Sequence, residues 1–220
     1  MLKLDKLKDG VKEMIDNICL FLTNKIRSET KEVDEEKLEV INYGLHLIIG
    51  EIPKIFIVLI VAYFLGILKY TIVMILVLLP YRNFSGGFHL KTHIGCIIST
   101  TLYYCGIPKI SNYIFLYNPM KVIFILCAWI FGTIMITKYA PADTENVPIL
   151  RKKERKQKKI LSYISFTIGL IAALFIKNNI IVNIILFGNI IQSIMITPVA
   201  YKLTNNKYSY EVYGKGENIC

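Results

Sequence analysis

Apolar residues in this chain gather in long runs that short polar stretches separate. Residues 122–137, 160–176 and 178–201 carry no charged side chain, and residues 92–120 carry only Lys109. A helix of roughly 20 apolar residues crosses the hydrocarbon core of a bilayer. The pattern therefore predicts an all-α fold, a polytopic integral membrane protein, and it excludes a soluble enzyme.

The runs predict about six membrane helices. The first lies within residues 41–68, where Glu51, Pro53 and Lys54 interrupt the pattern and leave 55–68 as the deep part. The others are expected at residues 70–81, 92–108, 122–137, 160–176 and 180–201. Residues 110–120 are apolar but short, which indicates an external or re-entrant segment.

Residues 1–27 precede these runs and have apolar side chains at helical spacing, with charged ones largely between them. This pattern predicts an amphipathic helix, which could lie on the inner membrane surface, pack on the protein's own loops, or do both. Residues 28–39 are polar and predict a connector or a helix start. We therefore divide the chain into an N-terminal interfacial segment 1–40, a membrane domain 41–201 and a cytoplasmic tail 202–220.

The net charge of +10 at first suggests a nucleic-acid partner, but its distribution argues against one. Eight of the 26 basic residues precede position 41, and eight lie in the predicted loop 138–159. Such clusters mark cytoplasmic segments of membrane proteins. Both termini are therefore expected in the cytoplasm, with the lipid bilayer as partner. The basic run 151–159 is either this ordinary topology pattern or an anchor for anionic lipid or an acidic partner.

Candidate chemistry gathers between residues 82 and 96, which are expected at the inner membrane face. A nucleophilic Cys96 would need a base, and the histidines His89 and His93 lie nearby in sequence. Gly86 and Gly87 could offer backbone N–H groups to an oxyanion, while Arg82 could hold a substrate carboxylate. Residue types alone equally allow a buried cysteine and interfacial histidines.

The identity of the base stays open on spacing alone. On a straight helix, His89 and Cys96 share a face but lie about 10 Å apart, whereas His93 is only one turn away. Either His93 is the base, or the link between His89 and Cys96 is not regular helix. The same three residues could ligate zinc, but no paired cysteines support such a site, so we expect neither metal nor cofactor.

The segment from Arg82 through Gly86 and Gly87 to His89, followed by Cys96, resembles the signature of the accessory gene regulator B (AgrB) family. These proteins are membrane cysteine endopeptidases of Gram-positive bacteria that process the AgrD precursor in quorum sensing. Residues 139–149 are similar to the characteristic loop of the same family. The two blocks come in the family's order, and the resemblance covers essentially the whole chain.

The resemblance implies His89 as the catalytic histidine and Cys96 as the nucleophile, with Arg82 and the glycine pair in support. It implies a substrate-binding role for Asp143, Glu145 and Asn146 in the second block. The implied reaction cleaves the precursor through a thioester on the enzyme and closes a thiolactone or lactone ring. A homodimer is also implied. A non-catalytic transporter or scaffold explains the spans equally well, but not the grouping of these residues.

Overall fold

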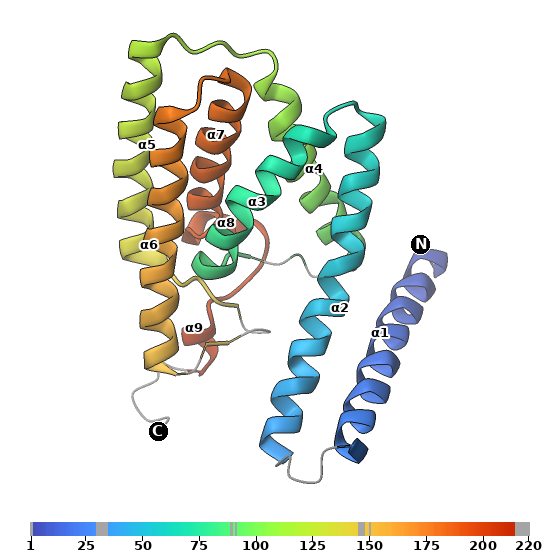
Figure 1. Cartoon of the computed structure of the whole chain (residues 1–220). Coiled ribbons are helices and arrows are strands. Elements are labelled where there is room, and N and C mark those ends of the chain that lie inside the picture. The colour runs from blue at the N-terminus through green and yellow to red at the C-terminus, as the bar shows by residue number, and fades with distance from the viewer. Residues whose placement is uncertain are drawn as a thin grey trace.

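The computed structural model describes residues 2–29, 35–88, 90, 92–144, 148–149 and 151–213. This part of the chain is helical and contains no strand. The helices, labelled in Figure 1, are α1 (Leu2–Glu29), α2 (Glu35–Phe64), α3 (Leu68–Ser85), α4 (His93–Ser111), α5 (Asn118–Tyr139), α6 (Lys152–Phe175), α7 (Asn179–Met195), α8 (Pro198–Leu203) and α9 (Ser209–Tyr213).

Two helices of the described chain are long and apolar enough to cross a membrane, namely Pro119–Tyr139 within α5 and Lys152–Phe175, which is α6. The segment Ile52–Phe64 of α2 and helix α7 are apolar but shorter. The prediction of an all-helical protein is confirmed, whereas the number of six spans stays a prediction.

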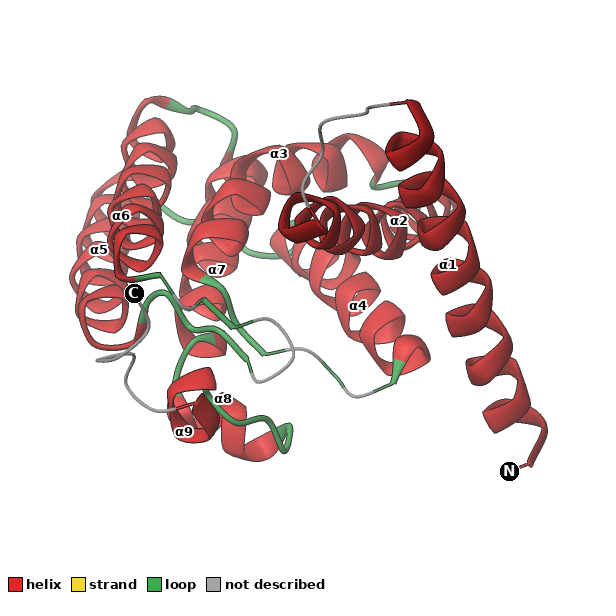
Figure 2. Ribbon diagram, turned by 90° about the horizontal axis from the view of Figure 1, so that it is seen from below, coloured by secondary structure: helices red, strands yellow, loops and turns green. Residues whose placement is uncertain are grey.

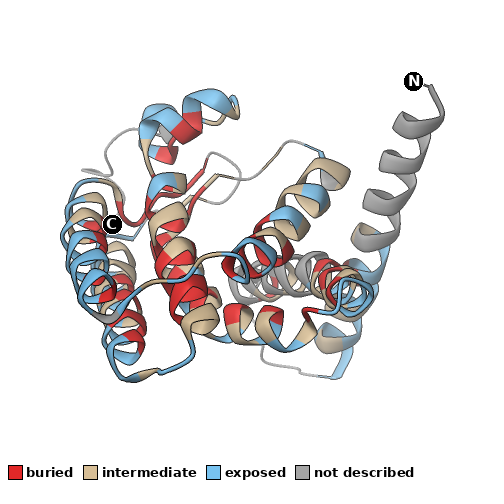
Figure 3. Ribbon diagram, turned by 90° about the horizontal axis from the view of Figure 1, so that it is seen from above, coloured by how far each residue is buried: buried red, intermediate tan, exposed pale blue. Residues whose placement is uncertain are grey.

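The surface of α5 shows what kind of solvent this helix faces. Its buried residues Ile125, Ala128, Gly132 and Ile136 recur every three or four positions and form one stripe. Apart from Lys138 in its last turn, its exposed large side chains are apolar: Met120, Val122, Ile123, Phe124, Leu126, Trp129, Ile130 and Ile134. An apolar surface of this extent is a liability in water and is natural in lipid. Figure 3 shows exposed residues along the outer sides of the bundle and buried ones along its middle.

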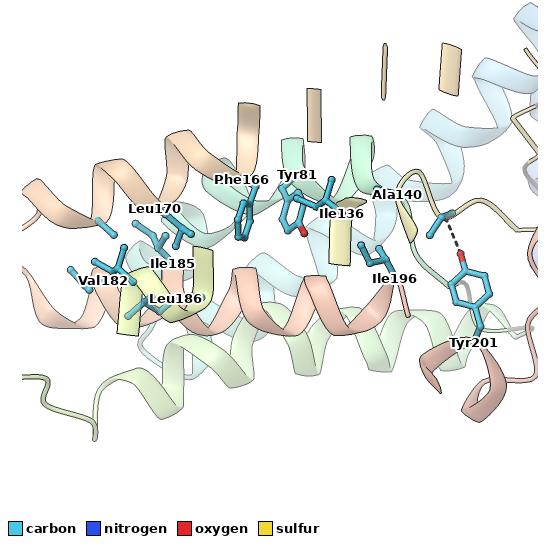
Figure 4. Close-up of a cluster of buried hydrophobic side chains, with 14 of the residues drawn as sticks. Tyr81, Ile136, Ala140, Phe166, Leu170, Val182, Ile185, Leu186, Ile196 and Tyr201 are labelled. Carbon is cyan, nitrogen blue, oxygen red and sulfur yellow. Dashed lines mark hydrogen bonds between the residues drawn. The ribbon is translucent and has the colours of Figure 1, made fainter. Parts of the chain in front are cut away.

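Helix α7 is the centre of the bundle, because it contacts α3, α4, α5, α6 and α8. It separates two apolar clusters. One lies between α3, α5, α6 and α7, and Figure 4 shows it extending from Val182 to Tyr201. The other lies between α2, α3, α4 and α7. Four polar side chains of α7 are nevertheless buried: Asn183, Asn189, Gln192 and Ser193.

Two prolines lie inside continuous helices. Helix α2 runs through Pro53, where the apolar pattern is interrupted, and the division of this segment into an interfacial lead-in and a deep part at 55–68 stays a prediction. Helix α3 runs through Pro80 and ends four residues later than predicted, at Ser85. Residues 112–117, within the segment expected to be external or re-entrant, form the connection between α4 and α5.

The predicted start of α6 and the predicted end of α7 are wrong. The basic residues from Lys152 onward form the first turns of α6 and are not part of a loop. Helix α7 ends at Met195, and a separate helix α8 starts at Pro198, where the Thr197 side chain accepts a hydrogen bond from Ala200 N–H. Proline fits the first turn of a helix because no N–H is needed there.

The predicted helix over residues 1–27 is confirmed as α1, which packs against α2. Cys19 is buried, and the Thr23 hydroxyl donates a hydrogen bond to Asn42 of α2. On the same helix, Leu20 and Phe21 are exposed. Packing on the protein itself is thus observed, and membrane contact of the remaining apolar side chains stays a prediction.

Replacing Gly132 with alanine should destabilise the bundle. The added methyl group would overlap the ring of Phe166, which is fully buried and packs against Tyr81 at a centroid distance of 5.2 Å. Overpacking of this kind costs about 1–3 kcal/mol. Gly106→Ala is the matched control, since an added methyl there meets nothing within 4 Å. Thermal unfolding in detergent compares the two; equal stability of both variants would contradict this account of the α5–α6 contact.

Candidate functional site

The end of α3 is a sharp turn that only glycine adopts readily. Gly86 has φ of 76° and Gly87 has φ of 139°, both in the region that side chains disfavour. A Cβ atom on Gly86 would also overlap the carbonyl group of Ala142. The glycine pair therefore permits both the turn and a close approach of two backbone segments.

The approaching segments are the two sequence blocks that resemble the AgrB signature. Gly87 N–H donates to the Ala142 carbonyl over 2.8 Å, and Ala142 N–H donates to the Ser85 carbonyl over 2.8 Å. These bonds form a short parallel β-bridge between Gly86 and Ala142. Two blocks that are far apart in the sequence thus form one backbone unit, which we call the glycine junction (residues 85–87 and 142).

Both amides of the glycine pair have backbone acceptors in this structure, and their expected oxyanion role stays a prediction. Gly86 N–H donates to the Arg82 carbonyl over 2.9 Å, and Gly87 N–H is taken by Ala142. Neither amide hydrogen is free to meet an oxyanion. In this structure the glycine pair shapes the junction, and an oxyanion role would require one of these bonds to be exchanged.

Arg82 lies beside the junction and is held by α7. Its Nη1 donates to Gln192 Oε1 over 3.2 Å and contacts the Met195 sulfur at 3.3 Å. Gln192 is fully buried, and its Nε2 donates to Ser85 Oγ over 3.0 Å and to the Gly86 carbonyl over 2.8 Å. Sequence reasoning missed Gln192, although a polar residue within an uncharged apolar run already marks a functional candidate.

Asp143 is buried, and its carboxylate is occupied by internal partners. Arg155 of α6 binds both carboxylate oxygens, at 2.8 Å and 3.3 Å. Ile149 N–H and the Ser209 hydroxyl also donate to Oδ2. This arrangement orders the loop rather than presenting Asp143 to a substrate. Glu145 and Asn146, expected in the same role, lie outside the described residues.

The C-terminal segment closes over the same loop. The Tyr201 hydroxyl donates to the Ala142 carbonyl over 2.8 Å, and the Tyr201 and Tyr208 rings stack at 4.0 Å. Thr144 and Tyr208 form an antiparallel bridge. Desolvation, reinforced by Tyr208 and Asp143, raises the pKa of Tyr201 well above its usual value. Tyr201 therefore stays protonated at neutral pH and can donate its hydrogen bond.

Cys96 lies in the first turn of α4 and is half-buried. Its N–H donates to the Thr92 carbonyl over 2.9 Å, and the Thr92 side chain caps the helix at Gly95 N–H. Figure 2 shows that α4 begins on the side of the bundle away from α5 and α6. His89 lies outside the described residues, as does the side chain of His93, so the choice of base stays a prediction.

The four other cysteines are in different surroundings. Cys19 is buried between α1 and α2, and Cys105 is buried with its thiol 3.6 Å from the Val58 carbonyl. Cys127 is exposed on α5, and Cys220 lies outside the described chain. Among the described cysteines, Cys96 alone starts a helix directly after the connection from the glycine junction.

A family model for accessory gene regulator B matches residues 19–196. The chain belongs to the AgrB family. An AgrB-like protein of Clostridium acetobutylicum is 28% identical and covers 92% of this chain and 93% of its own length. AgrB-like proteins of Listeria innocua and Clostridium perfringens are 31% and 30% identical and cover 82% and 84% of the chain, and 87% and 86% of their own lengths. No solved structure matches.

Membership in the AgrB family agrees with the apolar helices in indicating a membrane location. It also associates the chain with peptide processing in agr quorum sensing. The matched residues 19–196 include both halves of the glycine junction, Gln192 and Cys96. We call the connection between α5 and α6, residues 140–151, the junction loop. The buried residues Tyr208 and Ser209, which contact this loop at Thr144 and Asp143, lie beyond the match.

Replacing Asp143 with asparagine should loosen the junction loop. The change leaves Arg155 without a charge partner, and we expect a cost of about 3 kcal/mol, at the lower end for a buried pair because Arg155 is partly exposed. Glu154→Gln is the control, because the Glu154–Lys158 pair is exposed and should contribute little. Limited proteolysis of the loop and thermal unfolding report the difference; a loop equally protected in both variants would refute the structural role of Asp143.

Proposed function

We propose that the chain is a multi-pass membrane cysteine endopeptidase that cleaves an AgrD-type peptide precursor. The observation that carries the proposal is the glycine junction. It joins the two family blocks through backbone hydrogen bonds, and the chain leads from it through His89 to Cys96 in the first turn of α4. A non-catalytic transporter or scaffold would not need this arrangement.

In the proposed reaction, the Cys96 sulfur attacks a backbone carbonyl carbon of the precursor while His89 accepts the thiol proton. The tetrahedral intermediate collapses, the peptide C–N bond breaks, and His89 returns the proton to the leaving amine. The C-terminal part departs, and the N-terminal part stays on Cys96 as a thioester. In this proposal Arg82, whose hydrogen bonds among the described residues come from Nη1 alone, supplies the positive charge that favours the thiolate or holds a substrate carboxylate.

Ring closure follows from the thioester. A thiol within the retained peptide attacks the thioester carbonyl, a new thioester forms, and the Cys96 thiol is released. One thioester replaces another, so the step is close to balanced in free energy and needs no further energy source. A serine hydroxyl in place of the thiol would give a lactone. Both routes require that water be kept from the intermediate.

The charge distribution supports a cytoplasmic site in a protein of about six spans with both termini inside. The first turns of α6 carry the basic run, and Arg155 from this run binds Asp143 of the junction loop. The basic end of the bundle and the junction are therefore the same end. Lys121, at the opposite end, donates to the last carbonyls of α6 at Leu174 and Ile176. A homodimer and contact of α1 with the inner lipid surface complete the proposal.

Cys96→Ala should abolish precursor cleavage, because no other group would then form the thioester. Cys127→Ala is the control, since Cys127 is exposed on α5 and should be dispensable. Each variant is co-expressed with an AgrD-type precursor, membrane insertion is checked, and products are identified by mass spectrometry. Normal cleavage by Cys96→Ala would exclude the cysteine endopeptidase and favour the transporter or scaffold.

His89→Ala should slow formation of the acyl-enzyme by roughly 100- to 10,000-fold, the usual contribution of a general base. His93→Ala should have a much smaller effect, although His93 is nearer to Cys96 along the chain. The rate of Cys96 alkylation against pH, measured in both variants, compares the two histidines. If the pH dependence of Cys96 alkylation shifts to higher pH in His93→Ala and stays unchanged in His89→Ala, the base is His93.

A further inference from the structure

Gln192 differs from the other buried polar residues near it on α7. Asn189 donates to the Ile185 carbonyl of its own helix over 2.8 Å. Ser193 donates to the Asn189 carbonyl over 2.8 Å and meets the Tyr81 hydroxyl at 2.9 Å. Gln192 instead directs both ends of its amide away from α7, to Ser85, Gly86 and Arg82.

These contacts determine how the Gln192 amide is oriented. Its oxygen must face the Arg82 guanidinium, which can only donate, and its nitrogen must face the Gly86 carbonyl, which can only accept. Reversing the amide would place donor against donor and acceptor against acceptor. Because the side chain is fully buried, water cannot replace the lost bonds, and each unpaired group would be costly.

The orientation of Gln192 is passed on to Arg82. Among the described residues, the hydrogen bonds of the guanidinium come from Nη1, to Gln192 and Met195, while Nη2 and Nε have no acceptor. The guanidinium is half-buried. Two partners on Nη1, together with the planarity of the guanidinium, restrict the direction in which the remaining N–H groups point.

We infer that Gln192 is a positioning residue for peptide cleavage, which fixes the Arg82 guanidinium and the glycine junction in their working geometry. The inference rests on the proposed function, because the geometry it fixes is that of the proposed endopeptidase site. Gln192 touches neither the precursor nor Cys96 and acts through Arg82. Displacement of a positioned group by about 1 Å slows an enzyme by up to about 100-fold.

A double-mutant cycle on the full-length protein in lipid vesicles tests this inference. Gln192→Met keeps the size of the side chain and removes its polar atoms, and Arg82→Met removes the guanidinium. We expect Gln192→Met to slow cleavage of an AgrD-type precursor about 10- to 100-fold through kcat, with KM little changed. The double variant should be no slower than Arg82→Met, because residues that act as a unit are not additive.

Asn189→Leu is the matched control, because Asn189 is buried on the same helix and its side chain donates to the Ile185 carbonyl of that helix. It should lower the unfolding temperature about as much as Gln192→Met and leave kcat within about threefold. If Gln192→Met fails to insert, Gln192→Leu replaces it in the cycle, since leucine also lacks the polar atoms that bind Arg82 and Gly86.

Multiplicative rate losses in the double variant, or an unchanged kcat in Gln192→Met, would overturn the positioning role. Equal kcat losses in Gln192→Met and Asn189→Leu would also overturn it, since they would indicate general destabilisation. If the proposed function itself is wrong, the result is recognised separately, because the Cys96→Ala variant would then still cleave the precursor. Cleavage that depends on Cys96, with independent effects of Gln192 and Arg82, would reject the inference alone.

Discussion

The backbone contact between Gly86 and Ala142 is the constraint on which the rest of the site depends. The contact is possible because Gly86 has no side chain and adopts a positive φ. It places the Ala142 carbonyl where both Gly87 N–H and the Tyr201 hydroxyl donate hydrogen bonds to it. The next residue, Asp143, is then in reach of Arg155. One close approach therefore joins the end of α3, the start of α6 and the C-terminal segment.

A second constraint is the cost of buried polar groups in an apolar bundle. Helix α7 meets it in two ways. Asn189 bonds to its own helix, which satisfies its amide nitrogen without linking segments. Gln192 donates hydrogen bonds to Ser85 and Gly86 at the end of α3, which links α7 to this turn. The buried amide of Gln192 is therefore satisfied only while the turn keeps its position. The first arrangement tolerates movement of neighbouring helices, and the second does not.

The apolar runs predicted the existence of the helices but not their ends. Pro53 interrupts the apolar pattern and Pro80 lies near the expected end of its run, yet each lies within a continuous helix, because packing of neighbouring helices outweighs one lost hydrogen bond. The two sequence blocks meet in the fold, and Arg82 is linked to their contact through Gln192, while the catalytic roles of these residues stay a prediction. The use of the glycine amides, and Gln192 as a partner, could not be predicted, since both depend on contacts between residues distant in sequence.

Helix α6 begins before its apolar part, so its basic N-terminal turns extend beyond the apolar part as one continuous helix. The helix begins at Lys152, eight residues before the uncharged run that starts at Ile160, which corresponds to about 12 Å of helix. Arg155 lies on this extension and binds Asp143. A bilayer of different thickness changes the tilt of a spanning helix. Because Arg155 on this extension holds Asp143, we expect such a change of tilt to move the loop that follows Ala142.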